Sequence, residues 1–132
     1  MAAFNLTIKD ETAGGVTIHE VPVSFDSELA SVKEIIRARV YAEVDGYNNK
    51  MPEYFKGLVQ PGDAEKTLNG YKMKKKHKID AEQQYLVALD AFRENGYFLL
   101  IDNIQAESLE QFVVINEQTE ISFIKLTPLV GG

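Results

Sequence analysis

The sequence predicts an α+β domain, because two alternating strand patterns come first, a long helical pattern follows, and further strand patterns close the chain. The chain has 132 residues, the length of one domain, and its composition is 45% hydrophobic and 26% charged. This composition is typical of a globular protein with one core. We expect a folded domain over residues 1–126, with an insertion at 46–96, followed by a flexible tail at 127–132.

The first elements form a predicted β-hairpin. Apolar and polar residues alternate over 4–8, two glycines at 14–15 supply a turn, and the alternation returns over 16–25. The apolar parity changes near Glu20, which predicts a bulge or the end of the strand there. Pro22 has no N–H to donate, so we place the second strand at an edge of its sheet.

A long helix is predicted from about residue 28 to residue 45, where apolar residues recur at spacings of three and four. Asp26, Ser27 and Ser31 all offer capping side chains, and Ser31 and Glu34 have the spacing of a capping box, so the start is uncertain by several residues. Gly46 supplies a stop. The region after it is the least regular part of the chain. Within it, Pro52 is expected to open a short helix through Leu58.

A second helix is predicted over 80–94, with Asp80 as its N-cap and the pair at 95–96 as its end. The continuous apolar run 97–101 then predicts a strand buried on both faces. Ile104 and Leu109 are expected to anchor a looped return to the core.

The chain closes with two more apolar segments. The first is 112–115, and the polar turn 116–119 leads from it into the last strand at 121–126. A hairpin, a long helix, an interruption and closing strands are the element order of a β-grasp sheet wrapped round a helix. In that fold the first and last strands pair in parallel at the centre, and the second strand lies at an edge, where Pro22 is acceptable.

The stretch 97–132 resembles the second half of ubiquitin, down to a tail that ends in Leu129-Val130-Gly131-Gly132, and 4–44 resembles the first half. More closely, the chain is similar to the diglycine-ended ubiquitin-like proteins of bacterial operons that also encode ubiquitin-type enzymes. The tail, the turn at 78–80 and the run 91–99 carry that likeness. The resemblance implies a ubiquitin-like β-grasp with a helical insertion between the first helix and the third strand.

The resemblance also implies a protein modifier that is not itself an enzyme and needs no cofactor. Its reacting group would be the carboxylate of Gly132, which an ATP-dependent activating enzyme adenylates, converts to a thioester and passes towards an amine of a target protein. The partners implied are that activating enzyme, a conjugating enzyme, a metal-dependent isopeptidase and the protein targets. Gly131 and Gly132 carry no Cβ, so they suit a narrow enzyme channel.

Pro128, Leu129 and Val130 are the residues that the activating enzyme would read. Ubiquitin has arginines in this part of its tail, so we expect a dedicated activating enzyme here. The sheet face with Ile124, Leu126 and Leu100 is the expected partner-binding surface. Self-association of the chain is a further possibility. The alternative is that the helix 80–94 covers this face.

A local basic run stands out on an acidic chain with a net charge of -6. It is interpreted as a solvated loop, with docking on an acidic partner or a supply of acceptor amines as alternatives. Nucleic acid and membrane surfaces are not expected as partners, because the rest of the chain is strongly acidic. The five lysines of this run are Lys72, Lys74, Lys75, Lys76 and Lys78.

Neither a metal site nor a catalytic site is expected. His19 and His77 are far apart without companions at ligand spacing, and the chain has no cysteine. The start of the chain lacks the pattern of a signal peptide, so we expect a cytoplasmic protein.

Two other functions stay open. One is a sulfur carrier of the same fold, in which Gly132 becomes a thiocarboxylate. The other is a β-grasp adaptor or assembly subunit that binds partners without any covalent bond, through the insertion and the sheet face.

Overall fold

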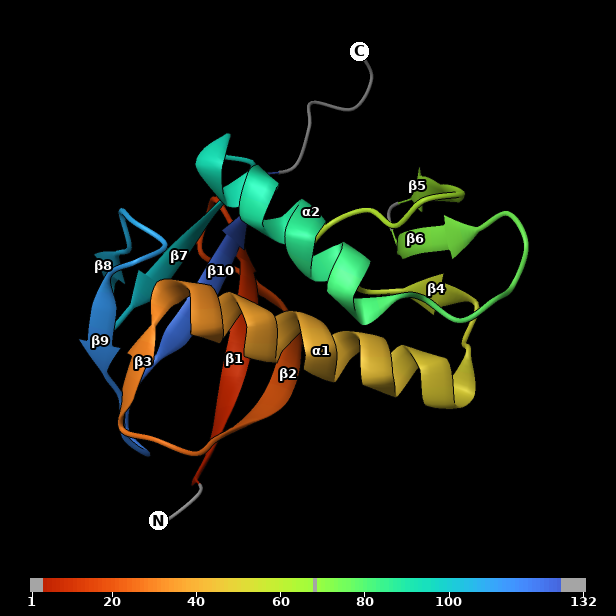
Figure 1. Cartoon of the computed structure of the whole chain (residues 1–132). Coiled ribbons are helices and arrows are strands. Elements are labelled where there is room, and N and C mark those ends of the chain that lie inside the picture. Colours follow the sequence, from red (N-terminus) through yellow and green to blue (C-terminus); the bar gives the residue numbers. More distant parts are fainter. Residues whose placement is uncertain (1–3, 68, 127–132) are drawn as a thin grey trace.

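The computed structural model describes residues 4–67 and 69–126, and it confirms an α+β fold (Figure 1). A five-stranded mixed sheet runs in the order β2-β1-β10-β7-β8. Its strands are β1 (Phe4–Thr12), β2 (Thr17–Phe25), β7 (Tyr97–Ile101), β8 (Ile104–Gln105) and β10 (Ile121–Lys125). The helices of the described part are α1 (Val32–Lys50) and α2 (Ala81–Arg93).

Two small antiparallel sheets complete the structure. One pairs β3 (Leu29–Ser31) with β9 (Phe112–Val114). The other has the order β4-β6-β5, with β4 (Tyr54–Phe55), β5 (Ala64–Thr67) and β6 (Gly70–Met73), and stands beyond α1 at the far end from β8 (Figure 1). No helix of the described residues has both the length and the apolar character needed to span a membrane.

The pairing of the large sheet agrees with the sequence at two positions. β1 and β10 are parallel neighbours in the interior of the sheet, with Lys9 opposite Ser122. β2 lies at the edge, where Pro22 pairs with Thr7 and the missing N–H interrupts no second ladder.

The change of parity in β2 comes from a bulge, as the sequence suggested. His19 lies opposite Asp10 and Thr17 lies opposite Glu11, so Ile18 is the extra residue. Ile18 is 52% exposed, whereas Val21 and Val23 on the same strand are buried.

Helix α1 begins later and ends later than predicted. Residues 29–31 form β3 instead, and Ser31 closes the capping box with Glu34 through two hydrogen bonds of 3.1 Å. Gly46 does not stop the helix, because the next turn places Tyr47 in the core against Phe55, with ring centroids 5.3 Å apart. Packing of this size outweighs the roughly 1 kcal/mol that glycine costs inside a helix.

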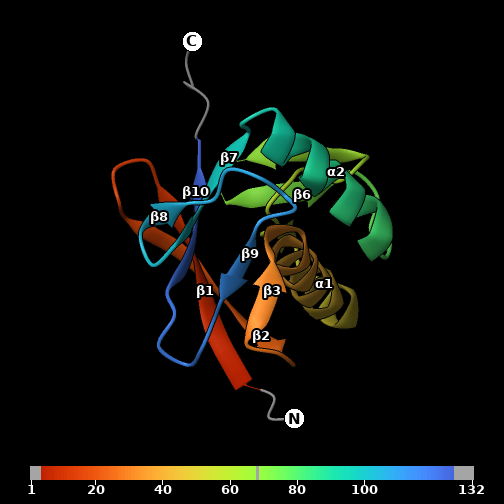
Figure 2. The same cartoon turned by 60° about the vertical axis from the view of Figure 1, so that its left-hand side comes forward.

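Both helices lie on the same face of the large sheet, and Figures 1 and 2 agree on this point. α1 crosses the sheet diagonally and α2 packs against α1. The core fills the space between α1 and the sheet. Its most deeply buried members are at most 1% exposed and include Ile8, Ile35, Ile36, Val40, Leu99, Ile121 and Phe123.

The insertion differs from the prediction in its first half. The short helix expected from Pro52 to Leu58 is absent, and β4 occupies this stretch, with Phe55 opposite Tyr71 in β6. Aromatic residues favour strands, and this pairing buries Phe55 to 1% exposure. The second helix forms as predicted, with the Asp80 carboxylate accepting the N–H of Gln83 at 3.2 Å.

Between β7 and β10, two predictions about burial are wrong. β7 is not buried on both faces, since Tyr97, Leu99 and Ile101 are buried and the residues between them are partly exposed. Ile104 is not a core anchor, because it is 70% exposed in β8 at the outer edge of the sheet, whereas Leu109 is buried as expected.

Candidate functional site

The last strand of the large sheet leads into the tail that the sequence singled out. β10 ends at Lys125, and Leu126 is the last described residue. The predicted conjugation and recognition residues all lie outside the described residues: Pro128, Leu129, Val130, Gly131 and Gly132. The site that the structure describes is therefore the surface from which this tail departs.

The outer face of the sheet next to this point is partly apolar. Ile124 lies opposite Phe98, and Ser122 lies opposite Leu100. Ile124 and Leu100 are partly exposed, and Leu126 is 44% exposed. Helix α2 does not cover this face, because it lies on the α1 side, where the Tyr97 hydroxyl donates to the Ala88 carbonyl at 2.7 Å.

Under the opposite face, a buried ion network joins three parts of the fold. The guanidinium of Arg39 on α1 donates to both carboxylate oxygens of Asp10 on β1, one of these bonds measuring 2.9 Å. Arg39 also donates from Nε to the Glu43 carboxylate at 3.0 Å. Glu43 in turn accepts the backbone N–H of Leu58, in the insertion, at 3.1 Å. The network ties the insertion to the sheet through α1.

The charges of this network hold one another in place. Burial raises the pKa of Glu43, although Arg39 and the Leu58 N–H oppose the rise. Burial alone would lower the pKa of Arg39, but the carboxylates of Glu43 and Asp10 outweigh it and raise that pKa instead. A buried cation between two carboxylates is held by charge-assisted hydrogen bonds, so each of the three groups depends on the other two.

A cleft of about 820 Å³ opens beside this network, between the end of the large sheet, the insertion and α2. We call it the junction cleft. Its floor consists of buried residues, and Ile18 and Leu126 stand exposed at its rim. The floor and walls include Leu58, Val59, Tyr71, Val87, Ala91 and Tyr97.

The junction cleft is basic on an acidic protein. Lys56, Lys66 and Lys125 line it, and the acidic side chain in the lining, Asp10, is bound to Arg39. Lys125 reaches across to the Gly57 carbonyl at 2.8 Å and lies 5.6 Å from the Tyr71 ring centroid. Burial lowers the pKa of Lys125.

His19 shares the basic environment of the cleft. Burial lowers its pKa, Asp10 acts in the opposite direction, and Arg39, Lys56 and Lys125 lower it further. His19 lines the cleft together with Asp10, Lys56 and Lys125.

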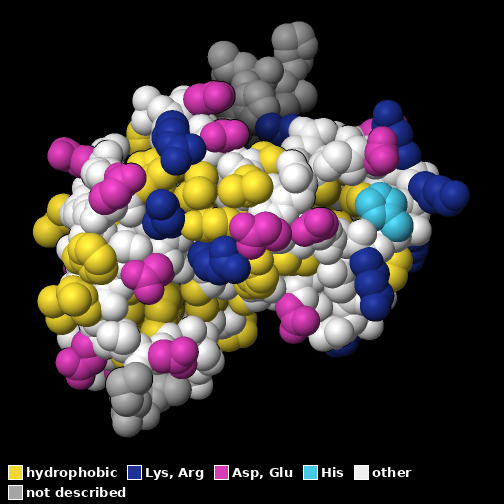
Figure 3. Space-filling model, in the orientation of Figure 1, with side chains coloured by type: hydrophobic (Ala, Val, Ile, Leu, Met, Phe, Trp, Pro, Cys, Tyr) yellow, Lys and Arg dark blue, Asp and Glu magenta, His cyan; other side chains and the backbone are white. Residues whose placement is uncertain are grey.

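The lysine run lies elsewhere, on β6 and the loop that follows it. Its five lysines are exposed, and the Lys72 ammonium lies 3.8 Å from the Glu53 carboxylate. Figure 3 shows Lys and Arg side chains gathered at this end of the molecule. Exposed amines are accessible to a partner or to acylation, and the contacts of the loop favour neither role.

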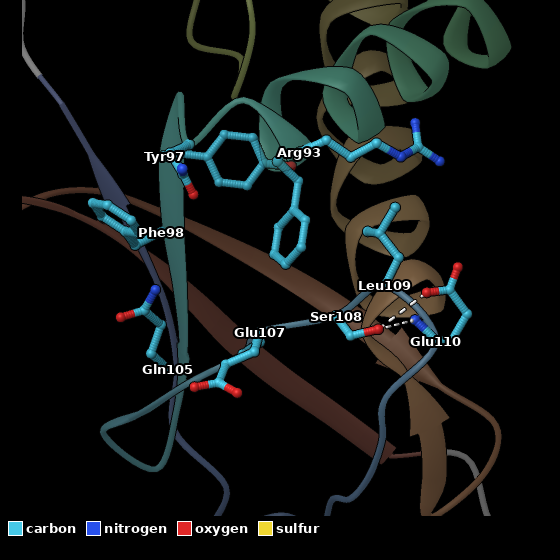
Figure 4. A pocket seen from close by; sticks show the side chains of 11 residues that line it. Arg93, Tyr97, Phe98, Gln105, Glu107, Ser108, Leu109 and Glu110 are labelled. Atoms are coloured by element: carbon cyan, nitrogen blue, oxygen red, sulfur yellow. Dashed lines mark hydrogen bonds between the residues drawn. The ribbon is translucent and has the colours of Figure 1, made fainter.

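A smaller pocket of about 410 Å³ lies between the end of α2 and the loop after β8 (Figure 4). Tyr97 points into it, whereas Phe98 points away to the outer face of the sheet. The Ser108 hydroxyl donates to the Glu110 carboxylate at 3.0 Å on its rim. These polar groups bond within their own loop and do not converge on a common point, so the pocket has no arrangement typical of catalysis.

Comparison with protein-family models, with curated proteins and with solved structures finds no match. Within 4–67 and 69–126, no group of three or more histidine, aspartate or glutamate side chains lies placed to hold a metal ion.

Neither the ion network nor the junction cleft was predicted from the sequence, although the ion network left a signal there. Asp10 continues the inward alternation of the first strand, and Arg39 and Glu43 interrupt the apolar face of the helix at a spacing of four. Charged residues at core positions of two packed elements indicate a buried ion pair. The cleft lysines come from separate segments and gave no such signal.

Proposed function

We propose that this protein is a ubiquitin-like modifier of β-grasp architecture, attached to target amines through Gly132. The observation that carries the proposal is the parallel pairing of β1 with β10 in the interior of the sheet, with the hairpin partner β2 at its edge and α1 across one face. This arrangement delivers the chain after β10 from the end of a rigid sheet. The sequence there, Leu129-Val130-Gly131-Gly132, is of the kind that an activating enzyme accepts.

The reaction uses no side chain of this protein. The Gly132 carboxylate attacks the α-phosphorus of ATP, and pyrophosphate leaves. An enzyme thiolate displaces AMP from the acyl-adenylate, and a target amine then displaces the thiolate to leave an amide. The role of the folded body is to present the tail and to be recognised, through the outer face with Ile124 and Leu100 and through the exposed Leu126 that follows β10.

The test incubates the full chain with ATP and an activating enzyme from a bacterial operon of the ubiquitin type, and weighs the products by mass spectrometry. A thioester with the enzyme, or an amide with a target protein, supports the proposal. Exchange of one oxygen for sulfur would identify a sulfur carrier, and an unchanged mass would leave the adaptor function. Either result contradicts the modifier.

Two variants sharpen the test. Gly132→Ala adds a Cβ to the reacting residue and is expected to lower adduct formation at least about tenfold. Gly46→Ala is the matched control, because a Cβ at Gly46 meets nothing within 4 Å and the residue lies on α1. Equal loss in both variants would mean that the tail is not the reacting site.

A further inference from the structure

We propose that the junction cleft binds an extended peptide segment of a partner protein that combines apolar side chains with carboxylates. The proposal does not depend on the modifier function, because a modifier, a sulfur carrier and an adaptor would all present the same cleft. It rests on the charge, the apolar lining and the strand edges of the cleft.

The charge of the cleft selects an anionic occupant. Lys56, Lys66 and Lys125 line it, and no ion pair within residues 4–67 and 69–126 involves any of these lysines. Asp10 is paired with Arg39, which it shares with Glu43, so the three lysines outnumber the acidic side chain in the lining. On a chain whose net charge is -6, this is a local region where a carboxylate is attracted and not repelled.

The apolar side chains of the lining favour a ligand that has apolar groups as well as negative charge. Ile18 is 52% exposed and Leu126 is 44% exposed at the rim, and Val87 and Ala91 of α2 are partly exposed in the wall. Covering these side chains removes apolar surface from water. The volume of about 820 Å³ suits several side chains of a segment better than one small ion.

The backbone at the cleft favours an extended peptide. Ile18 and His19 belong to β2, and Lys66 and Thr67 belong to β5. Each strand stands at the end of the strand order in its sheet, so each has an edge that no other described strand pairs with. A partner strand can bond to such an edge while its alternate side chains enter the cleft.

The experiment titrates the full chain against a fluorescein-labelled peptide of about ten residues that alternates leucine and glutamate, with fluorescence anisotropy as the readout. A second peptide replaces every glutamate by lysine. We expect the acidic peptide to bind at least about tenfold more tightly than the basic one. Equal binding of both peptides, or binding of neither at millimolar concentration, would overturn the proposal.

Charge reversals locate the site. The double variant Lys56→Glu/Lys66→Glu is expected to weaken binding of the acidic peptide about tenfold or more. Its matched control, Lys74→Glu/Lys75→Glu, makes the same change of charge in the exposed lysine run and should change binding less than about twofold. An equal effect of the control would show that net charge, and not the cleft, attracts the peptide.

A second measurement guards against a fold defect in the variants. Amide chemical shifts of the wild-type chain should move on addition of the acidic peptide at Gly57, Val59, Gly70 and Gly96, and stay fixed at Phe112 and Val114 on the opposite end of the molecule. Shifts confined to the lysine run would refute the cleft as the site. Complete displacement of the peptide by an equal concentration of decanoate would also contradict the proposal, since the occupant would then be a small amphipathic anion.

Discussion

At the scale of single residues, the buried ion network is the feature that most constrains this fold. Arg39 is 0% exposed and bonds to two carboxylates that are themselves buried, Asp10 and Glu43. Removing one member of such a set leaves uncompensated charge in the interior. Apolar residues of similar size in place of the whole set avoid that penalty.

We therefore expect Arg39→Met to lower the free energy of unfolding by about 3–5 kcal/mol. The triple variant Asp10→Leu/Arg39→Met/Glu43→Gln should lose less than Arg39→Met alone, because no charge stays buried and the amide oxygen at position 43 still accepts the Leu58 N–H. Urea denaturation measures both. A triple variant less stable than the single one would show that the network stabilises the fold beyond satisfying its own charges.

His19 makes the free energy of unfolding decrease as the pH falls. A histidine that is paired with a carboxylate has a raised pKa and has the opposite effect. The pKa of His19 in the folded chain is below the ordinary value of 6.5, so the unfolded chain takes up the proton first as the pH falls. The contribution of His19 to stability is thus complete above pH 6.5 and is lost as the pH drops through the folded pKa.

The measurement compares the free energy of unfolding at about pH 7.5 and about pH 5.5. The wild-type chain should lose more stability between these values than His19→Asn does. Identical pH profiles for wild type and His19→Asn would contradict the burial argument.

At the scale of elements, two glycines with opposite surroundings show what holds α1 and the insertion. Gly46 lies inside α1 with nothing within 4 Å of an added Cβ, so Gly46→Ala should stabilise the protein by about 0.5–1 kcal/mol. A Cβ at Gly57 would lie 2.1 Å from the ring of Phe55, which is 1% exposed and cannot move aside freely.

Gly57→Ala should therefore destabilise the protein by about 1–3 kcal/mol, and thermal unfolding of the two variants in parallel tests the contrast. It should also weaken the bond from Lys125 to the Gly57 carbonyl, since relief of the clash shifts the backbone there. If Gly57→Ala leaves the stability unchanged, the backbone or the Phe55 ring must shift to accommodate the added Cβ at little cost in free energy.

At the scale of the whole molecule, the insertion is bound to the body by polar contacts at several points. The Leu58 N–H donates to Glu43 and Lys125 donates to the Gly57 carbonyl, while within the insertion the Gln84 amide donates to the Val59 carbonyl at 3.2 Å. These contacts converge on 57–59, so the insertion and the sheet should unfold as one unit.

Native-state hydrogen exchange checks this expectation. The Leu58 amide should exchange with a free energy close to that of Leu99 in the sheet core, although it lies in a loop. In Glu43→Gln its protection should fall, because a neutral amide oxygen accepts more weakly than a carboxylate. Fast exchange of Leu58 in the wild-type chain would instead mark the insertion as a separately opening segment.

The sequence by itself determined the hairpin, the edge position of Pro22, the capping of the second helix and the order of the closing strands. Each follows from local rules: alternation of side chains along a strand, the missing N–H of proline, and side chains that bind the free N–H groups of a helix end. The diglycine motif at 131–132 is equally a property of the sequence alone.

Only the tertiary structure decided the rest, because it depends on contacts between distant segments. Tyr47 carries α1 past Gly46 by packing on Phe55, and pairing with β6 makes β4 a strand. The junction cleft brings together Lys56, Lys66 and Lys125 from three segments of the chain. No local pattern encodes such a meeting, since the distances that create it are set by the packing of the sheet, the helices and the insertion.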